Sequence, residues 1–84
     1  MSLEILTNAP QKIIGVKQAT KSLKSNKAQI LFVAKDAEQH VAREVLQLAE
    51  DHGVEVIYLQ TMKELGKACE IDVGAATAVI ENIS

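Results

Sequence analysis

The chain has 84 residues, of which 48% are hydrophobic, and its formal net charge is −2. This length allows one domain and no second, so residues 1–84 are taken as a single domain. Phe32 and Tyr58 are the only aromatic residues, which argues against the base-stacking platform of many single-strand binders. The single cysteine, Cys69, excludes an intramolecular disulfide and a multi-cysteine zinc site. No apolar run approaches the roughly 20 residues of a membrane span, and the first ten residues lack the pattern of a signal peptide. We therefore expect a cytoplasmic protein with no membrane partner.

Charge is distributed unevenly along the chain. Residues 1–35 carry six lysines and one acid, whereas residues 36–84 carry three cations and ten acids. A local basic face can bind a polyanion even when the net charge is negative, because the patch governs the contact. An ordinary solvated surface explains the lysines equally well, so charge alone leaves nucleic-acid binding open.

The first predicted elements are a short strand and a helix on either side of Gly15. Ile13 and Ile14 form an apolar pair before this glycine, and an amphipathic pattern follows it. The inner face of the predicted helix consists of Val16, Ala19 and Leu23, and the outer face of Lys17, Lys21 and Lys24. This spacing is typical of a helix packed on a core with a solvated basic side.

The middle of the chain predicts a strand, a helix and a second strand. Residues 30–34 form a continuous apolar run, typical of a central strand covered on both faces. Asp36 and Gln39 have the spacing of a capping box, and Gly53 is placed to end the helix. The apolar stripe of this helix consists of Val41, Val45, Leu48 and Ala49. Residues 54–59 are predicted to form another buried strand.

The last third predicts one more helix and strand. Thr61 and Glu64 have the spacing of a second capping box, and residues 75–80 have a strand's composition. The helical stripe consists of Met62, Leu65 and Cys69. Alternation of strands and helices predicts an α/β sandwich with helices on both faces of the sheet, and periodicity leaves the strand order open.

The sequence offers no catalytic constellation. Cys69 lies on an apolar helical stripe, where a small buried residue is the more common role of cysteine. His40 and His52 lie about three turns apart on one predicted helix, so they do not converge on a metal, and His52 at the helix end suits the helix dipole. We expect neither enzymatic activity nor a cofactor.

Two local features favour a binding function. Gly15 before a helix is explained either by a backbone kink or by close approach of the helix N-terminus to a polyanion, aided by Lys17 and Lys21. Ile71 and Val73 flank Asp72 in a predicted loop. Such apolar loop residues are either packed into the core, which the pattern favours, or exposed for a partner.

Three blocks together resemble a known family. They are residues 15–21 (GVKQATK), residues 33–37 (VAKDA), and residues 65–69 with 71–76 (LGKAC and IDVGAA). The chain resembles the kink-turn-binding ribosomal-protein family, which includes the archaeal large-subunit protein "seven-Ae". It is most similar to the bacterial YbxF-like paralogues. The resemblance runs from about residue 12 to residue 83 and implies a three-layer α-β-α sandwich with a mixed four-stranded sheet.

The resemblance also implies what the protein binds. Members of this family bind RNA kink-turns, in which a bulge beside tandem sheared G·A pairs bends the duplex. Lys17 and Gln18 would face guanine edges, Lys21 would contact phosphate or a guanine acceptor, and residues 71–73 would cover the bulged nucleotide. The full set of implied RNA-binding residues is Gly15, Lys17, Gln18, Lys21, Lys35, Glu38, Ile71, Asp72 and Val73. The partner would be a ribosomal, riboswitch or leader RNA, bound by a monomer, with the ribosome as a further candidate partner.

Two departures from the family pattern affect this expectation. Lys17-Gln18 replaces the Asn-Glu pair of archaeal members, and Glu70 stands where glycine is usual. A carboxylate at residue 70 could repel phosphate, or strain a position that prefers positive φ. Two alternatives therefore stay open: a translation-associated protein-interaction module whose interface is the acidic second half, and a small-ligand regulatory domain.

Overall fold

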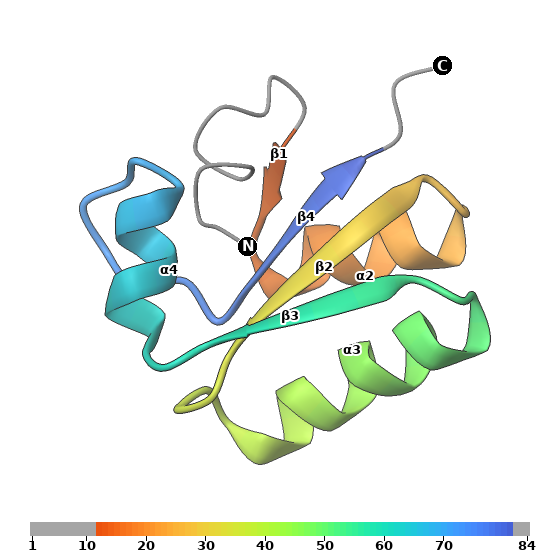
Figure 1. Ribbon diagram of the computed structural model, residues 1–84, viewed down its shortest axis with the longest axis horizontal. Helices are drawn as coiled ribbons and strands as arrows, with labels where there is room; N and C mark the ends of the chain where they lie inside the picture. Colours follow the sequence, from red (N-terminus) through yellow and green to blue (C-terminus); the bar gives the residue numbers. More distant parts are fainter. Residues whose placement is uncertain (1–11, 82–84) are drawn as a thin grey trace.

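The computed structural model describes residues 12–81 (Figure 1). Residues 1–11, the segment without a signal-peptide pattern, and residues 82–84 lie outside the described residues. The elements are β1 (Lys12–Ile14), α2 (Val16–Lys24), β2 (Ala28–Ala34), α3 (Gln39–Asp51), β3 (Glu55–Leu59), α4 (Met62–Ala68) and β4 (Thr77–Glu81). None of the helices in this part of the chain is long and apolar enough to cross a bilayer.

The four strands form one mixed sheet in the order β1-β4-β2-β3. Strand β4 is antiparallel to both β1 and β2, whereas β2 and β3 are parallel. Strands β1, β2 and β3 therefore run in the same direction, and their carboxyl ends lie at the end of the sheet where β4 begins. We call this end the carboxyl edge of the sheet.

Helices cover both faces of the sheet. Helices α2 and α3 lie beside one another on one face, and α4 lies apart from them on the other (Figure 1). The core under α2 and α3 includes the fully buried Leu23, Leu31, Val33, Val45 and Val79, and the core under α4 includes Phe32, Leu65 and Ala78. The three-layer α-β-α sandwich with a mixed four-stranded sheet is thereby confirmed.

Two predicted helix boundaries are also confirmed. Thr61 is the N-cap of α4, and its Oγ1 accepts a hydrogen bond from the backbone N–H of Glu64 at 3.0 Å. The Glu64 carboxylate in turn accepts from the N–H of Gln60 at 3.2 Å, one residue before the position that a standard capping box uses. Gly53 follows α3 with φ +66°, the left-handed conformation that glycine favours at a helix end.

Strand β3 differs from its prediction as a buried strand. It is the edge strand beside β2, and within its bounds only Leu59 is buried, while Tyr58 is 53% exposed. The apolar sequence is correct for a strand, but burial depends on its neighbours, and β3 has a partner strand on one side. This strand brings an aromatic ring to the surface.

Candidate functional site

The sequence-predicted site residues lie on segments that meet at or near the carboxyl edge of the sheet. The backbone N–H of Gly15 donates to the carbonyl of Thr77 at 3.1 Å, and that of Ala34 donates to Ala76 at 3.0 Å. These bonds extend the β1–β4 and β2–β4 ladders beyond their last paired residues. They fix the start of α2, the β2–α3 loop and the end of the α4–β4 loop relative to one another.

The N-terminus of α2 is open and lacks negative charge. Gly15 is its N-cap, with φ 108° and ψ 154°, and nothing lies within 4 Å of the place a Cβ would occupy. Its carbonyl accepts from Ala19 N–H at 2.9 Å, so the N–H groups of Val16, Lys17 and Gln18 have no acceptor within the helix. The first turn contains no acidic residue. Glycine is needed here for its backbone conformation, and the free N–H groups with the positive dipole end favour an electron-rich ligand.

Basic and amide side chains extend from this helix into solvent. Lys17, Gln18 and Lys21 are all exposed, and within residues 12–81 neither lysine forms an ion pair. Gln18 and Lys21 also line a hollow of about 180 Å³ between α2 and β1. The inner side of the helix is fixed by Ala19 and Leu23, which are fully buried. The helical spacing thus leaves these three side chains free for a partner.

The β2–α3 loop carries Lys35 and Glu38, and both are exposed. The Lys35 N–H donates to the carbonyl of Leu59 at 2.8 Å, which fixes the start of the loop. The predicted N-cap at Asp36 is wrong: α3 starts at Gln39, and its N-cap, Glu38, makes no side-chain cap bond. The Asp36 carboxylate instead accepts from the N–H of Met62 at 2.7 Å. A tertiary donor at the start of α4 replaces the local helix donor, and the bond ties this loop to α4.

The α4–β4 loop runs back along α4. Ile71 N–H donates to Gly66 at 3.1 Å and Ala75 N–H donates to Met62 at 3.0 Å. Because Gly66 has no Cβ, the carbonyl of Val73 can lie directly against α4. Ile71 is half-buried against the core, as the pattern favoured, whereas Val73 is 70% exposed. Residues 71–73 lie beside the middle of α4, and the loop reaches the carboxyl edge at Ala75 and Ala76.

Glu70 has a positive φ, as the glycine usual at this position predicted. Its φ is +63°, in the left-handed region that a glycine would adopt without strain. Its carboxylate lies 3.3 Å from the ammonium of Lys12 on β1. This contact offsets part of the negative charge near the loop, so the repulsion expected between Glu70 and phosphate is reduced.

Cys69 is a core residue, as its position on the helical stripe predicted. It is 3% exposed, and burial raises the pKa of its thiol, an effect that nearby Lys12 partly opposes. A thiol with a raised pKa is a poor nucleophile at neutral pH. His52 is the C-cap of α3, and its Nδ1 lies 2.7 Å from Oδ1 of Asn26. Among residues 12–81, no group of three His, Cys, Asp or Glu side chains is placed to hold a metal ion.

A comparison with known families identifies the fold's relatives. The model of the ribosomal protein L7Ae/L30e/S12e/Gadd45 family matches residues 2–84. The chain belongs to this L7Ae family. An "RNA-binding protein" of Caldanaerobacter subterraneus is 45% identical over 69 residues, covering 82% of this chain and 84% of the relative. The "RNA-binding protein YbxF" of Geobacillus stearothermophilus is 40% identical over 80 residues, covering 95% and 98%.

Solved structures show the same L7Ae-type fold. The "15.5kD RNA binding protein" of Giardia lamblia superposes with a TM-score of 0.85 at 23% identity, covering 98% of this chain and 72% of that one. The resemblance seen in the sequence blocks is therefore confirmed at the level of family and fold. The roles of individual residues in this L7Ae-family chain stay predictions.

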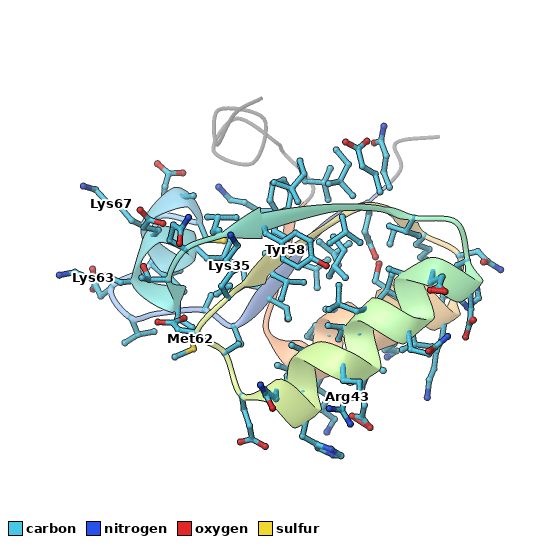
Figure 2. All side chains as sticks on the ribbon, turned by 60° about the horizontal axis from the view of Figure 1, so that its bottom comes forward. Lys35, Arg43, Tyr58, Met62, Lys63 and Lys67 are labelled. Atoms are coloured by element: carbon cyan, nitrogen blue, oxygen red, sulfur yellow. The ribbon has the colours of Figure 1, made fainter. Side chains whose placement is uncertain are left out.

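Sequence reasoning missed one surface. Tyr58 is exposed on β3, and Lys35 and Arg43 are the cations on the neighbouring loop and helix (Figure 2). The only signal in the sequence was Tyr58 itself, within a strand predicted to be buried. Without the strand order, no pattern could place that strand at the edge of the sheet.

Proposed function

We propose that this protein binds RNA kink-turns and stabilises their bent form, as a non-catalytic, translation-associated protein. The observation that carries the proposal is the open N-terminus of α2, where Gly15 leaves three N–H groups free beside the unpaired cations Lys17 and Lys21. Membership of the L7Ae family and the similarity to bacterial proteins named as RNA-binding support RNA as the ligand. Preferential binding of the kinked form would shift the RNA population toward it.

Direct reading of the RNA is assigned to the first turn of α2. The exposed Lys17 ammonium can donate to guanine O6 and N7, and the Gln18 amide can both donate and accept at a base edge. Lys21, one turn further along, and Lys35, on the neighbouring loop, would contact phosphate. Base contacts then supply specificity, and phosphate contacts supply affinity that depends on salt.

The bulged nucleotide is assigned to the α4–β4 loop and the β2–α3 loop. Val73 is 70% exposed although it is apolar, which suits contact with the face of an unstacked base. Ile71, half-buried, would hold the loop in place, and Asp72 lies exposed between them. Glu38, exposed at the start of α3, would accept a hydrogen bond from the flipped base.

The cellular setting follows from the same proposal. The protein would act as a cytoplasmic monomer without a cofactor, on a ribosomal, riboswitch or leader RNA. The alternative of a protein-interaction module rested on Glu70, whose carboxylate was expected to repel phosphate. Because Glu70 is paired with Lys12, that alternative has less support.

Binding titrations with two RNAs test the proposal. One RNA carries a kink-turn, and its twin has the tandem G·A pairs replaced by Watson–Crick pairs; both are measured at several salt concentrations. We expect tight binding to the kink-turn alone, weakening as salt rises. Lys17→Gln should reduce that preference. Lys27→Gln removes the same charge in the α2–β2 loop, at the far end of α2 from Lys17, and should leave the preference unchanged. Equal or absent binding to both RNAs would overturn the proposal.

A further inference from the structure

The only tyrosine of the chain lies at the surface of the edge strand. Tyr58 is 53% exposed, whereas the other aromatic residue, Phe32, is fully buried. Within residues 12–81 the Tyr58 hydroxyl has no hydrogen-bond partner. The ring therefore contributes little to the core and offers one face to a ligand.

One lysine lies beside this ring, and one arginine lies on the helix that covers the same face of the sheet. Tyr58 is opposite Val33 in the parallel β2–β3 ladder, and Lys35 follows two residues later, so Lys35 is a diagonal neighbour of Tyr58 on the same face of the sheet. Figure 2 shows Lys35 beside Tyr58, and it shows Arg43 on the neighbouring helix α3. Lys63 and Lys67 point outward from α4, away from the ring. Within the described residues, neither Lys35 nor Arg43 forms an ion pair.

A hollow joins the two cations. It has a volume of about 400 Å³ and is lined by Lys35, Gln39, Arg43 and Gln47, with Glu50 at its far end. The hollow is shallow and open to solvent, so a bound group would lie on it rather than be enclosed by it. The acids nearest the β3–α4 connection already accept backbone N–H groups, Asp36 from Met62 and Glu64 from Gln60. Apart from Glu50, the charged side chains that line the hollow are the cations Lys35 and Arg43, and together with the nearby ring of Tyr58 they complement a nucleotide.

We infer that Tyr58 stacks on an unpaired nucleotide that extends from the bound kink-turn RNA, with Lys35 and Arg43 contacting its phosphates. The inference rests on the proposed function, because Lys35 belongs both to the proposed kink-turn interface and to this surface. An RNA strand that leaves the carboxyl edge past Lys35 would next reach Tyr58 and then the hollow along α3. Stacking on one aromatic ring tolerates any base, so the contact adds affinity without adding sequence preference.

The emission of Tyr58 gives a direct measurement. Because the chain has one tyrosine and no tryptophan, its intrinsic fluorescence reports on this ring alone. Kink-turn RNAs with blunt ends are compared with the same RNAs carrying several unpaired nucleotides on the 5′ or the 3′ strand, with free tyrosine amide as the control for absorption by RNA. With one of the two extended RNAs, we expect quenching of the Tyr58 emission and about tenfold tighter binding than with the blunt RNA.

Matched variants separate ring stacking from other effects. Tyr58→Phe keeps the ring and should keep the gain in affinity from the extension, whereas Tyr58→Leu should bind extended and blunt RNA alike. Arg43→Gln should reduce the gain, and Lys63→Gln, the same charge change on the α4 side, should not. Binding to blunt RNA should be equal in all five proteins.

Three results would overturn the inference: equal affinity of the wild type for blunt and extended RNA, an undiminished gain in Tyr58→Leu, or Tyr58 emission that no RNA changes. Emission that no RNA changes would instead favour a protein as the partner of the Tyr58 ring. Failure of the proposed function is recognised separately, because the wild type would then bind blunt kink-turn RNA and its G·A-replaced twin equally.

Discussion

Replacing Gly66 with alanine tests whether backbone contact with α4 positions the α4–β4 loop. A Cβ at residue 66 would overlap the carbonyl oxygen of Val73 and lie 3.0 Å from the Cα of Gly74. The higher helix propensity of alanine would stabilise the protein by about 1 kcal/mol. Overpacking costs about 1–3 kcal/mol, and contact with backbone atoms puts this case at the upper end. We expect a net loss of roughly 1–2 kcal/mol in the free energy of unfolding, or a fall in Tm of roughly 4–16 °C.

Urea unfolding followed by circular dichroism measures the loss, and titration with kink-turn RNA measures its effect on binding. Affinity should fall as well, because the displaced loop carries Val73. Gly53→Ala is the control: its φ is +66° and nothing lies within 4 Å of its Cβ position, so it should lose stability by about 1 kcal/mol and keep its RNA affinity. Increased stability of Gly66→Ala with unchanged RNA affinity would refute the close-contact argument.

The remaining predictions concern charge, backbone strain and pH. Lys21→Gln should weaken binding to all RNAs uniformly and lower the slope of log affinity against log salt concentration by about one. Lys17→Gln should cost about 1–3 kcal/mol in binding to kink-turn RNA and relax the preference for G·A pairs. Identical behaviour of the two variants would contradict the assignment. Glu70→Gly should be more stable than Glu70→Ala by roughly 1 kcal/mol in urea unfolding, because both lose the contact with Lys12 and only alanine keeps the strain of φ +63°. Burial raises the pKa of the Cys69 thiol above its ordinary value of 9.0, so the folded protein keeps a proton that the unfolded chain has already lost. Wild-type stability should therefore fall as pH rises through 9 and beyond, relative to Cys69→Ala, and parallel pH profiles of the two proteins would contradict this.

The elements of the fold were predictable because their patterns are local. The helical spacing after Gly15 placed Ala19 and Leu23 inward, and both are fully buried. Asp36 shows where such reasoning fails. Its sequence spacing fits a capping box, but its carboxylate accepts a hydrogen bond from the N–H of Met62, which is distant in sequence. A tertiary donor that local sequence does not reveal decided that helix boundary.

The candidate site was predictable in part for the same reason. The exposed lysines of α2 follow from helical spacing, and a left-handed backbone at Glu70 was anticipated from the glycine usual at that place. Pattern could not separate Ile71, packed on the core, from Val73, exposed, because their burial depends on how the loop lies against Gly66. The surface at Tyr58 depends on strand order, which periodicity does not contain.

The bend of a labelled RNA shows whether this protein stabilises the kinked form. Fluorescence energy transfer is measured between dyes at the two stem ends of a kink-turn RNA, in monovalent salt, as the protein is added. We expect energy transfer to rise to saturation with the kink-turn RNA and to stay unchanged with the twin that lacks the tandem G·A pairs. Binding without a change in transfer, or an equal rise with both RNAs, would contradict the claim that this protein recognises and stabilises the kink.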